Sequence, residues 1–271
     1  MSGAPLALLA SLLWGTADFL AGRASRANPA VLVAFVGQVA GLVALGAIVA
    51  VRGADSDAFL PGALSGLFGA VAILAFYRAL ALGTMSVVAP IVATSAIVPV
   101  IAGVVDGERP GTLQWIGVIA ALTGVALASR EPGGAAKDAR KALQLAVLAA
   151  LGIGFALVFL GAAADHDALT GVAAARVVAV PILGVLVLGA RAKASARSLP
   201  GLAAIGLLDT GANTAFAIAT TGGLLSLVAV LGGLFPVVTV ALAYFLLHER
   251  LQPHQRIGVV LALAGIPLIS A

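Results

Sequence analysis

The segment Glu108–Ser129, ERPGTLQWIGVIAALTGVALAS, recurs near the end of the chain as Glu249–Ser270, ERLQPHQRIGVVLALAGIPLIS. The two segments are identical at 11 of 22 positions, including the initial Glu-Arg pair, an Ile-Gly-Val triplet and a second glycine seven residues after the first. Apolar helices often agree by chance, so the charged pair and the glycines carry most of the weight. The match indicates that the chain arose by duplication.

The duplication extends upstream of these two segments. Residues 66–91 match residues 206–231 at 10 of 26 positions, with an offset of 140. The beginnings of the two halves also pair, at an offset of 139, over residues 7–22 and 146–161. The predicted organisation is a first repeat over residues 1–129, a charged and glycine-rich linker over residues 130–141, and a second repeat over residues 142–271.

The composition is that of an integral membrane protein. Of the 271 residues, 62% are hydrophobic and 10% are charged, and the mean hydropathy is +1.16. Such a chain leaves no polar domain that could fold as a soluble catalytic unit, so we expect a multi-pass protein of the plasma membrane. The basic residues fall in loops that lack an aromatic platform, so the pI of 10.1 does not indicate nucleic-acid binding.

Ten apolar runs are long enough to span a bilayer at roughly 20 residues each. The predicted helices cover residues 4–22, 29–51, 61–82, 84–105, 112–129, 142–164, 168–190, 201–222, 224–247 and 255–271. Each repeat then holds an odd number of spans, so the second repeat enters the membrane from the opposite side. The predicted fold is an all-α integral membrane protein with ten transmembrane helices, arranged as two inverted five-helix repeats.

The distribution of basic residues predicts the orientation of the chain. Of the 15 lysines and arginines, 11 lie in the loops after the first, third, fifth, seventh and ninth predicted helices. Only Arg52 and Arg109 lie in the other loops. Because cytoplasmic loops are enriched in lysine and arginine, this distribution places the linker in the cytoplasm and both termini outside.

Several short motifs resemble those of the EamA family of the drug/metabolite transporter superfamily, and the resemblance covers essentially the whole chain. Leu13-Trp14-Gly15 is similar to the opening Trp-Gly motif of that family, and Arg176 stands where the family often has an arginine. Gly107-Glu108-Arg109 and His248-Glu249-Arg250 resemble its Gly-Glu-Arg turn before the last helix of each repeat. The segment Ser226–Pro236 resembles its cavity helix. The resemblance implies the ten-helix type and transport of a small metabolite or drug-like solute, commonly as efflux.

The chain departs from this family pattern at three places. Gln38 occupies the position in the first repeat that matches Arg176, His248 replaces a turn glycine, and Pro99 is displaced relative to Pro236. The resemblance also implies a gating or packing role for the turn glutamates. It further implies cytoplasmic termini, which is the opposite of the orientation that the charges predict.

Apart from Arg256 in the first turn of the last span, four charged residues lie inside the predicted spans: Asp18, Arg78, Arg176 and Asp209. None is matched by a charged residue in the other repeat, so the shared scaffold does not require them. Intramembrane charges that a scaffold does not need favour a functional site. For Arg78, which is close to a helix end, extension of the side chain to the headgroups is an equally good interpretation.

The helix over residues 201–222 carries the face most typical of a site, because Asp209, Asn213, Phe216 and Thr220 recur on one side of it. Trp14 and Asp18 form a similar pair, one turn apart. Thr94 and Ser95 lie between two prolines, although their hydroxyls could simply bond to their own helix, and Trp14 could be a packing residue. The candidate substrate-binding or coupling residues are Trp14, Asp18, Arg78, Thr94, Arg176, Asp209, Asn213 and Phe216.

These residues predict a secondary transporter that exports a small metabolite, amino-acid-like or drug-like solute by alternating access between the repeats, with protons as the candidate coupling ion. The alternative is an intramembrane enzyme that acts on a lipid or prenyl substrate. Such an enzyme would need clustered carboxylates or a histidine with a partner, whereas Asp18 and Asp209 are isolated and the histidines lie in loops. We therefore expect no enzymatic activity, cofactor or metal, and hypothesise that Asp209, partnered by Arg176, carries the coupling charge.

Overall fold

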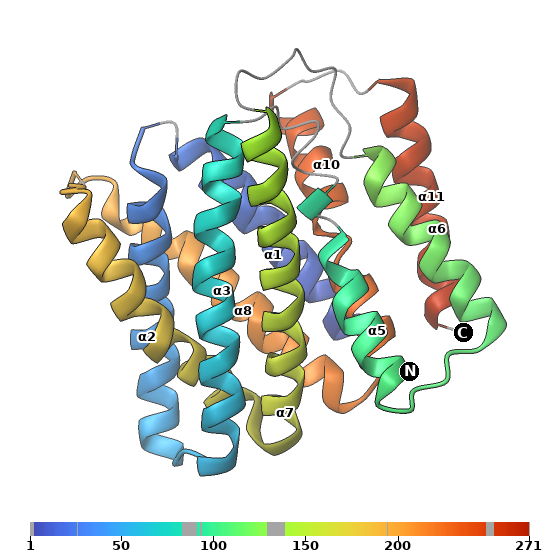
Figure 1. Cartoon of the computed structure of the whole chain (residues 1–271), viewed down its shortest axis with the longest axis horizontal. Helices are drawn as coiled ribbons and strands as arrows, with labels where there is room; N and C mark the ends of the chain where they lie inside the picture. The colour runs from blue at the N-terminus through green and yellow to red at the C-terminus, as the bar shows by residue number, and fades with distance from the viewer. Residues whose placement is uncertain are drawn as a thin grey trace.

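The computed structural model describes residues 3–25, 27–82, 91–92, 94–128, 139–193, 195–247 and 252–270, and all regular secondary structure within them is helical (Figure 1). The helices are α1 (Ala4–Ala24), α2 (Ala30–Arg52), α3 (Ser56–Leu82), η1 (Thr94–Ala96), α5 (Ile97–Val105), α6 (Thr112–Ala128), α7 (Ala139–Gly189), α8 (Leu199–Thr221), α9 (Leu225–Gly232), α10 (Phe235–Leu247) and α11 (Pro253–Ser270). The expected all-α class is confirmed for these residues.

Within the described residues, five helical segments are long and apolar enough to cross a membrane: 4–24, 30–52, 56–76, 140–189 and 199–221. Shorter apolar helices cover residues 94–105, 112–127, 225–239 and 253–269. The fourth predicted span begins at residues outside the described part, which resumes with Ile91 and Val92, the 3-10 turn η1 and α5. The expected count of ten separate spans is therefore met in part.

One predicted boundary agrees with the structure and one differs. The spans expected at 142–164 and 168–190 are the two helical halves of α7, which are separated by a break at Asp167, where φ is −156° and ψ is 112°. The Asp167 carboxylate accepts a hydrogen bond from the backbone N–H of Thr170 at 2.7 Å and so caps the second half of α7. The helix expected over 224–247 is interrupted between α9 and α10. Pro236 stands in the first turn of α10, where its missing N–H costs no helical hydrogen bond.

The repeats contact each other through small residues that let helix backbones approach closely. A Cβ on Gly206 of α8 would lie 2.1 Å from the carbonyl oxygen of Gly37 of α2. A Cβ on Gly66 of α3 would lie 2.1 Å from the carbonyl oxygen of Ala175 of α7. In the repeat alignment Gly66 matches Gly206 and Gly37 matches Ala175. The same close approach therefore occurs twice. In one contact α2 of the first repeat meets α8 of the second, and in the other α3 of the first repeat meets α7 of the second.

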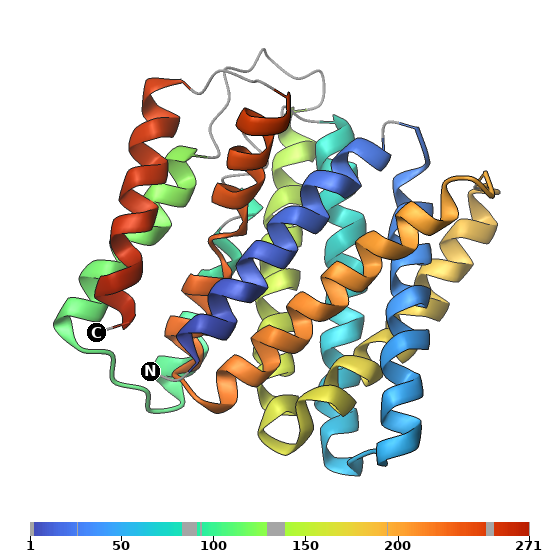
Figure 2. The ribbon, with the colours of Figure 1, turned by 180° about the vertical axis from the view of Figure 1, so that it is seen from behind.

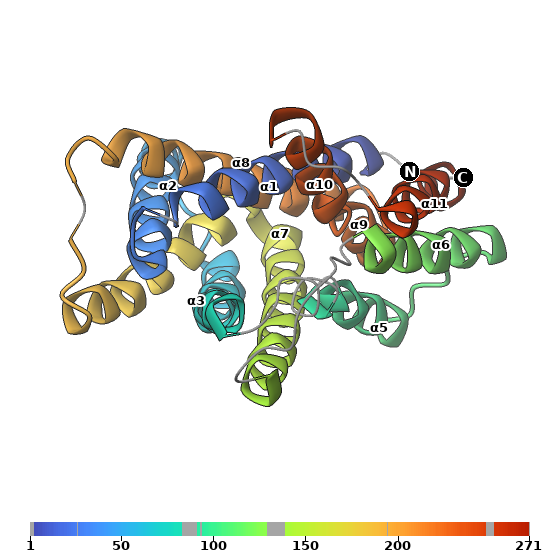
Figure 3. The same ribbon diagram turned by 90° about the horizontal axis from the view of Figure 1, so that it is seen from above.

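The helices that contain the repeated segments, α6 and α11, lie side by side in all three ribbon views (Figures 1, 2 and 3). Gly117 packs against Gly265, and Gly124 packs against Gly258. Because the contacts advance along α6 as they retreat along α11, the two helices are antiparallel. Two helices of matching sequence thus run in opposite directions.

The outer surface is apolar. Val51, Val105 and Leu188 are 91%, 82% and 78% exposed, and many other large aliphatic side chains are also exposed. Water would penalise so much exposed apolar surface, whereas lipid tails accept it. The interior is held by a cluster around α9, in which Leu227, Leu231 and Phe216 of α8 are fully buried.

Candidate functional site

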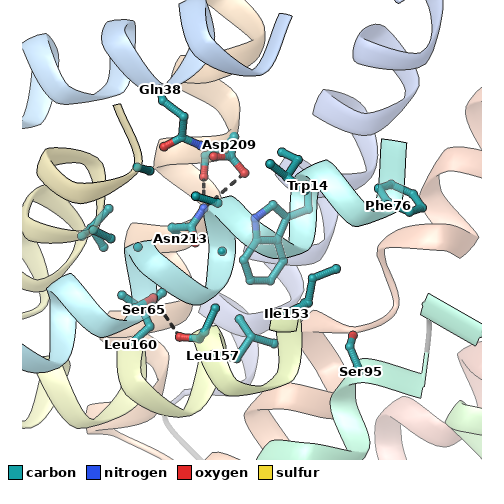
Figure 4. A pocket seen from close by; sticks show the side chains of 18 of the residues that line it. Trp14, Gln38, Ser65, Phe76, Ser95, Ile153, Leu157, Leu160, Asp209 and Asn213 are labelled. Carbon is teal, nitrogen blue, oxygen red and sulfur yellow. Dashed lines mark hydrogen bonds between the residues drawn. The ribbon is translucent and has the colours of Figure 1, made fainter. Parts of the chain in front are cut away.

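A cavity of about 180 Å³ lies between the two repeats. It is lined by α1, α2, α3 and η1 of the first repeat and by α7, α8 and the α9–α10 break of the second. In Figure 4, Gln38, Asp209 and Asn213 lie on one side of Trp14, and Ser95 lies on the other. The polar and aromatic lining residues are Trp14, Asp18, Gln38, Ser65, Phe76, Ser95, Arg176, Asp209, Asn213 and Phe235.

Arg176 occupies the polar side of this cavity and has two partners. Its Nη1 donates a hydrogen bond to Gln38 Oε1 at 2.8 Å, and its Nη2 donates to Asp209 Oδ2 at 2.8 Å. Asn213 Nδ2 donates to the backbone carbonyl oxygen of Asp209 at 2.7 Å and to Asp209 Oδ1 at 3.2 Å. The Arg176 side chain is 8% exposed and that of Asp209 is 33% exposed, so Asp209 presents the more accessible end of the ion pair.

Gly41 of α2 allows Arg176 to take this place. A Cβ on Gly41 would lie 3.4 Å from Arg176 Nε and 2.0 Å from Thr210 Oγ1. Both of these atoms are buried and have no hydrogen-bond partner among the described residues. The Arg176 side chain therefore packs close to α2 at Gly41. Its Nη atoms, and not its Nε, form hydrogen bonds with polar side chains.

Asp18 of α1 has a different environment from Asp209. It is solvent-exposed and lines both the main cavity and a smaller one of about 50 Å³. Gln38, Ile73 and Asp209 also line both cavities, which therefore meet at these four residues. Within the described residues, neither ion pair includes Asp18. Its carboxylate is thus presented to the cavities.

Trp14 forms the aromatic part of the wall. Its ring centroid lies 5.6 Å from that of Phe216 and 6.5 Å from that of Phe235, the second contact being edge-to-face. Phe216 is fully buried and does not line the cavity, and a Cβ added to Gly232 would lie 3.3 Å from the Cδ2 of Phe216. Phe216 therefore supports Trp14 from behind, as aromatic pairs commonly do.

The structure brings together five of the eight candidates from the sequence: Trp14, Asp18, Arg176, Asp209 and Asn213 all line the cavity. Arg78 is exposed and is not among the lining residues. Thr94 is also exposed and outside the lining, and its hydroxyl donates to the carbonyl oxygen of Ile91 at 2.6 Å. The neighbouring Ser95 lines the cavity instead.

Comparison with known proteins assigns this architecture to a family. A model of the EamA-like transporter family matches residues 1–130 and residues 140–271. The chain belongs to the EamA-like transporter family. It is therefore an integral multi-pass membrane protein of a transporter family whose members handle small solutes.

No curated protein matches this EamA-like chain. A solved structure titled "Crystal structure of protein" is 20% identical to it, over 98% of this chain and 96% of that chain, with a TM-score of 0.79. At that identity the likeness shows the fold alone.

In this EamA-like transporter, Glu108 joins the repeats at a second place. Its carboxylate accepts hydrogen bonds from the backbone N–H groups of Leu225 and Ser226, the latter at 2.9 Å. These donors open α9, where unpaired N–H groups and the helix dipole favour a negative charge. The corresponding turn of the second repeat, His248-Glu249-Arg250, lies outside the described residues.

A third link between the repeats is the ion pair between Arg52, at the end of α2, and Asp167, at the break in α7. From the sequence, Asp165-His166-Asp167 is expected to be a solvated turn rather than a metal site. Among the described residues, no group of three or more histidine, aspartate or glutamate side chains could hold a metal ion.

Sequence reasoning missed Gln38, Ser65, Phe76 and Phe235 as site residues, and Ser95 was considered only together with Thr94. Gln38 was identified only as the repeat counterpart of Arg176. The signal that could have found it is the duplication itself. When two repeats are related by a two-fold axis, matched residues that lie close to the axis also lie close to each other, as Gln38 and Arg176 do. Phe76 is the repeat counterpart of Phe216, and Phe235 lies in the segment Ser226–Pro236 that resembles the family's cavity helix, so the sequence held a signal for each of them.

Proposed function

We propose that this chain is a secondary transporter that exports a small amino-acid-like or drug-like solute by alternating access between its repeats. The observation that carries the proposal is the cavity between the repeats, in which Arg176 of the second repeat donates hydrogen bonds to Asp209 of the same repeat and to Gln38 of the first. Charged side chains at such depth are costly and are typical of solute or ion pathways.

The proposed architecture is ten spans in two inverted repeats, over residues 1–129 and 142–271. It is supported by the antiparallel packing of α6 against α11 and by the reciprocal contacts of α2 with α8 and of α3 with α7. Inverted repeats provide two related arrangements around one central site, and rocking between them exposes that site to each side in turn. The close glycine contacts would allow helix backbones to slide past one another.

The proposed mechanism uses the ion pair as an element that opens and closes. With the pair closed, as in this structure, Asp209 is held by Arg176 and Asn213. When the pair opens, Asp209 becomes available to a proton or to the solute, and Arg176 remains bound to Gln38. The chain contains no phosphate-binding glycine loop, so the driving force in this proposal is an ion gradient rather than ATP.

Two measurements test the proposed function. An untargeted comparison of metabolites inside and outside cells that overexpress the chain is expected to show one solute class shifted to the outside. Liposomes containing the purified protein should then move that solute without altering it. Recovery of a chemically changed solute would favour the intramembrane enzyme, and absence of movement for every shifted solute would contradict the transporter.

A further inference from the structure

The cavity between the repeats has an unequal charge balance. Its ionisable lining residues in the described part of the chain are Asp18, Arg176 and Asp209. Arg176 and Asp209 neutralise each other at 2.8 Å. Asp18 has no ion-pair partner among the described residues, although it is exposed to the cavity. With both carboxylates ionised, the lining carries one excess negative charge.

The single guanidinium is not placed to receive an anionic solute. Nη1 and Nη2 of Arg176 already donate to Gln38 and Asp209, and its buried Nε faces Gly41 of α2. An anion would have to displace one of these partners, and would then lie beside two carboxylates. Like charges at short distance in a poorly hydrated site repel strongly. The lining therefore disfavours solutes with a net negative charge.

The aromatic residues of the cavity suit a positive charge. Trp14 precedes Asp18 by four residues on α1, so the indole ring and the carboxylate lie on the same face of the helix. Phe235 meets Trp14 edge-to-face, and both rings line the cavity. Cations, including alkylammonium groups, are attracted to the faces of tryptophan and phenylalanine rings. The rest of the lining is mainly aliphatic, which would receive an apolar body.

We propose that the cavity binds a cationic solute with an apolar body, of the alkylammonium or arylammonium class, whose charge is held by Asp18 beside the rings of Trp14 and Phe235. This inference rests on the proposed transport function and names its substrate class. Asp18 lies where the main cavity meets the smaller one, so a cation bound there is adjacent to both cavities. The volume of about 180 Å³ favours a small solute, since pockets for drug-sized ligands measure roughly 300–1,000 Å³.

The test is a binding assay that does not depend on transport. The chain has two tryptophans, so Trp115→Phe leaves Trp14, one turn from Asp18, as the sole indole reporter in the detergent-purified full chain. Three probes share a benzyl group: benzyltrimethylammonium, benzyl alcohol and phenylacetate. The cation has a fixed charge, so its own ionisation does not change with pH. The expected result is a saturable change in Trp14 fluorescence with the cation, at a Kd at least tenfold below those of the neutral and anionic probes.

Matched variants locate the charge that is responsible. Asp18→Asn should weaken cation binding at least tenfold, Asp18→Glu should retain most of it, and Asp165→Asn, which removes an exposed carboxylate outside the cavity, should leave it unchanged. A melting curve shows whether each variant is folded. If Asp18→Asn is unfolded, the preference among the three probes and the Asp18→Glu result decide the question.

Equal binding of the three probes, preference for phenylacetate, absence of cation binding, or full affinity in folded Asp18→Asn would each overturn the proposal. These outcomes are distinguishable from failure of the transport function. A protein that binds the cation but moves no solute across liposomes contradicts transport, whereas one that exports an anion or a neutral solute contradicts only the substrate class.

Discussion

Arg176 donates a hydrogen bond of 2.8 Å to Gln38, the residue that occupies the position of Arg176 in the first repeat. In a two-fold arrangement, a residue can touch its own counterpart only close to the axis that relates the copies. The two repeats differ at this point, because the second supplies Arg176 and Asp209 where the first has Gln38 and Gly69. The duplicated scaffold thus acquired an asymmetric charge pair near its centre.

The Arg176–Asp209 pair is expected to behave as a unit in stability measurements. Removing one member of a buried ion pair leaves the other charge uncompensated, at a cost of roughly 3–5 kcal/mol. Because Asp209 is about one-third exposed, we expect Arg176→Gln to lower the free energy of unfolding by about 3 kcal/mol, the lower end of this range. Arg176→Gln with Asp209→Asn should be more stable than Arg176→Gln alone, as measured by thermal unfolding in detergent.

The double-mutant cycle separates coupling from general damage. Gln38→Ala is a useful third variant, since it removes an uncharged partner of Arg176 and should cost about 1 kcal/mol. Strict additivity of Arg176→Gln and Asp209→Asn would show that the pair contributes nothing to the folded state.

Glu108 is expected to stabilise the contact between the first repeat and the start of α9. Glu108→Gln removes the negative charge and one of the two acceptor oxygens that receive Leu225 N–H and Ser226 N–H. A loss of about 1 kcal/mol is expected from the capping and dipole contributions. Gly103→Ala should also lower the stability, because a Cβ there would lie 2.3 Å from Glu108 Oε2 and displace the carboxylate.

Asp106→Asn is the control for this prediction, since it neutralises an exposed carboxylate two residues away. Thermal unfolding of the three variants, measured side by side, gives the comparison. Equal melting temperatures for Glu108→Gln and Asp106→Asn would argue that the cap adds no stability.

Gly206 is expected to be intolerant of a side chain. A Cβ at this position would meet backbone atoms of Gly37, which cannot move without separating α2 from α8. Overpacking of this kind typically costs about 1–3 kcal/mol. Gly201→Ala on the same helix is the matched control, because nothing lies within 4 Å of its added Cβ. Folded yield and melting temperature should fall for Gly206→Ala only, and similar values for both variants would contradict the close-contact argument.

Much of the helical pattern could be predicted from the sequence, because bilayer thickness limits span length and apolar runs are easily recognised. The first residues of α1 and α2 and both ends of α6 agree with the predicted spans to within about one residue. The break between α9 and α10 was not predicted, since an apolar run conceals where its backbone hydrogen bonds are interrupted. The junction inside α7 lies in the predicted turn over residues 165–167, whereas the hydrogen bond by which Asp167 caps the second half was not predicted.

The polar part of the site was easier to predict than its aromatic part. Charges such as Asp18, Arg176 and Asp209 stand out in an apolar helix, because the bilayer penalises them unless they face protein or water. Phe216 shares the face of Asp209 by helical spacing, yet lies behind Trp14 rather than in the cavity. Spacing gives the direction in which a side chain leaves its helix, but not the neighbour that covers it.

The orientation prediction follows from the distribution of basic residues. We expect residues 130–141 to be cytoplasmic and Ala271 to be outside, because 11 of the 15 lysines and arginines lie in one set of loops. Fusions after Ala271 to a reporter active only outside and to one active only in the cytoplasm test this directly. Activity of the cytoplasmic reporter alone would reverse the assignment and give the orientation that is usual for the family.

Proton coupling through Asp209 can be tested separately from solute binding. If Asp209 alternates between Arg176 and a proton, Asp209→Asn should abolish acceleration of transport by a pH gradient. Solute exchange without a gradient should remain within about threefold of wild type, since Asn preserves the shape and most of the hydrogen bonding. The measurement is uptake into liposomes with and without an imposed pH gradient, at a temperature at which the variant is folded.

Two variants control this experiment. Asp165→Asn removes an exposed carboxylate outside the cavity and should keep the full response to the gradient. Arg176→Lys keeps the positive charge but loses the planar fork that engages Gln38 and Asp209 together, so it should weaken the pair while retaining some response. A wild-type response in Asp209→Asn would assign Asp209 to structure alone, because a side chain that cannot take up and release a proton cannot couple the gradient to the solute.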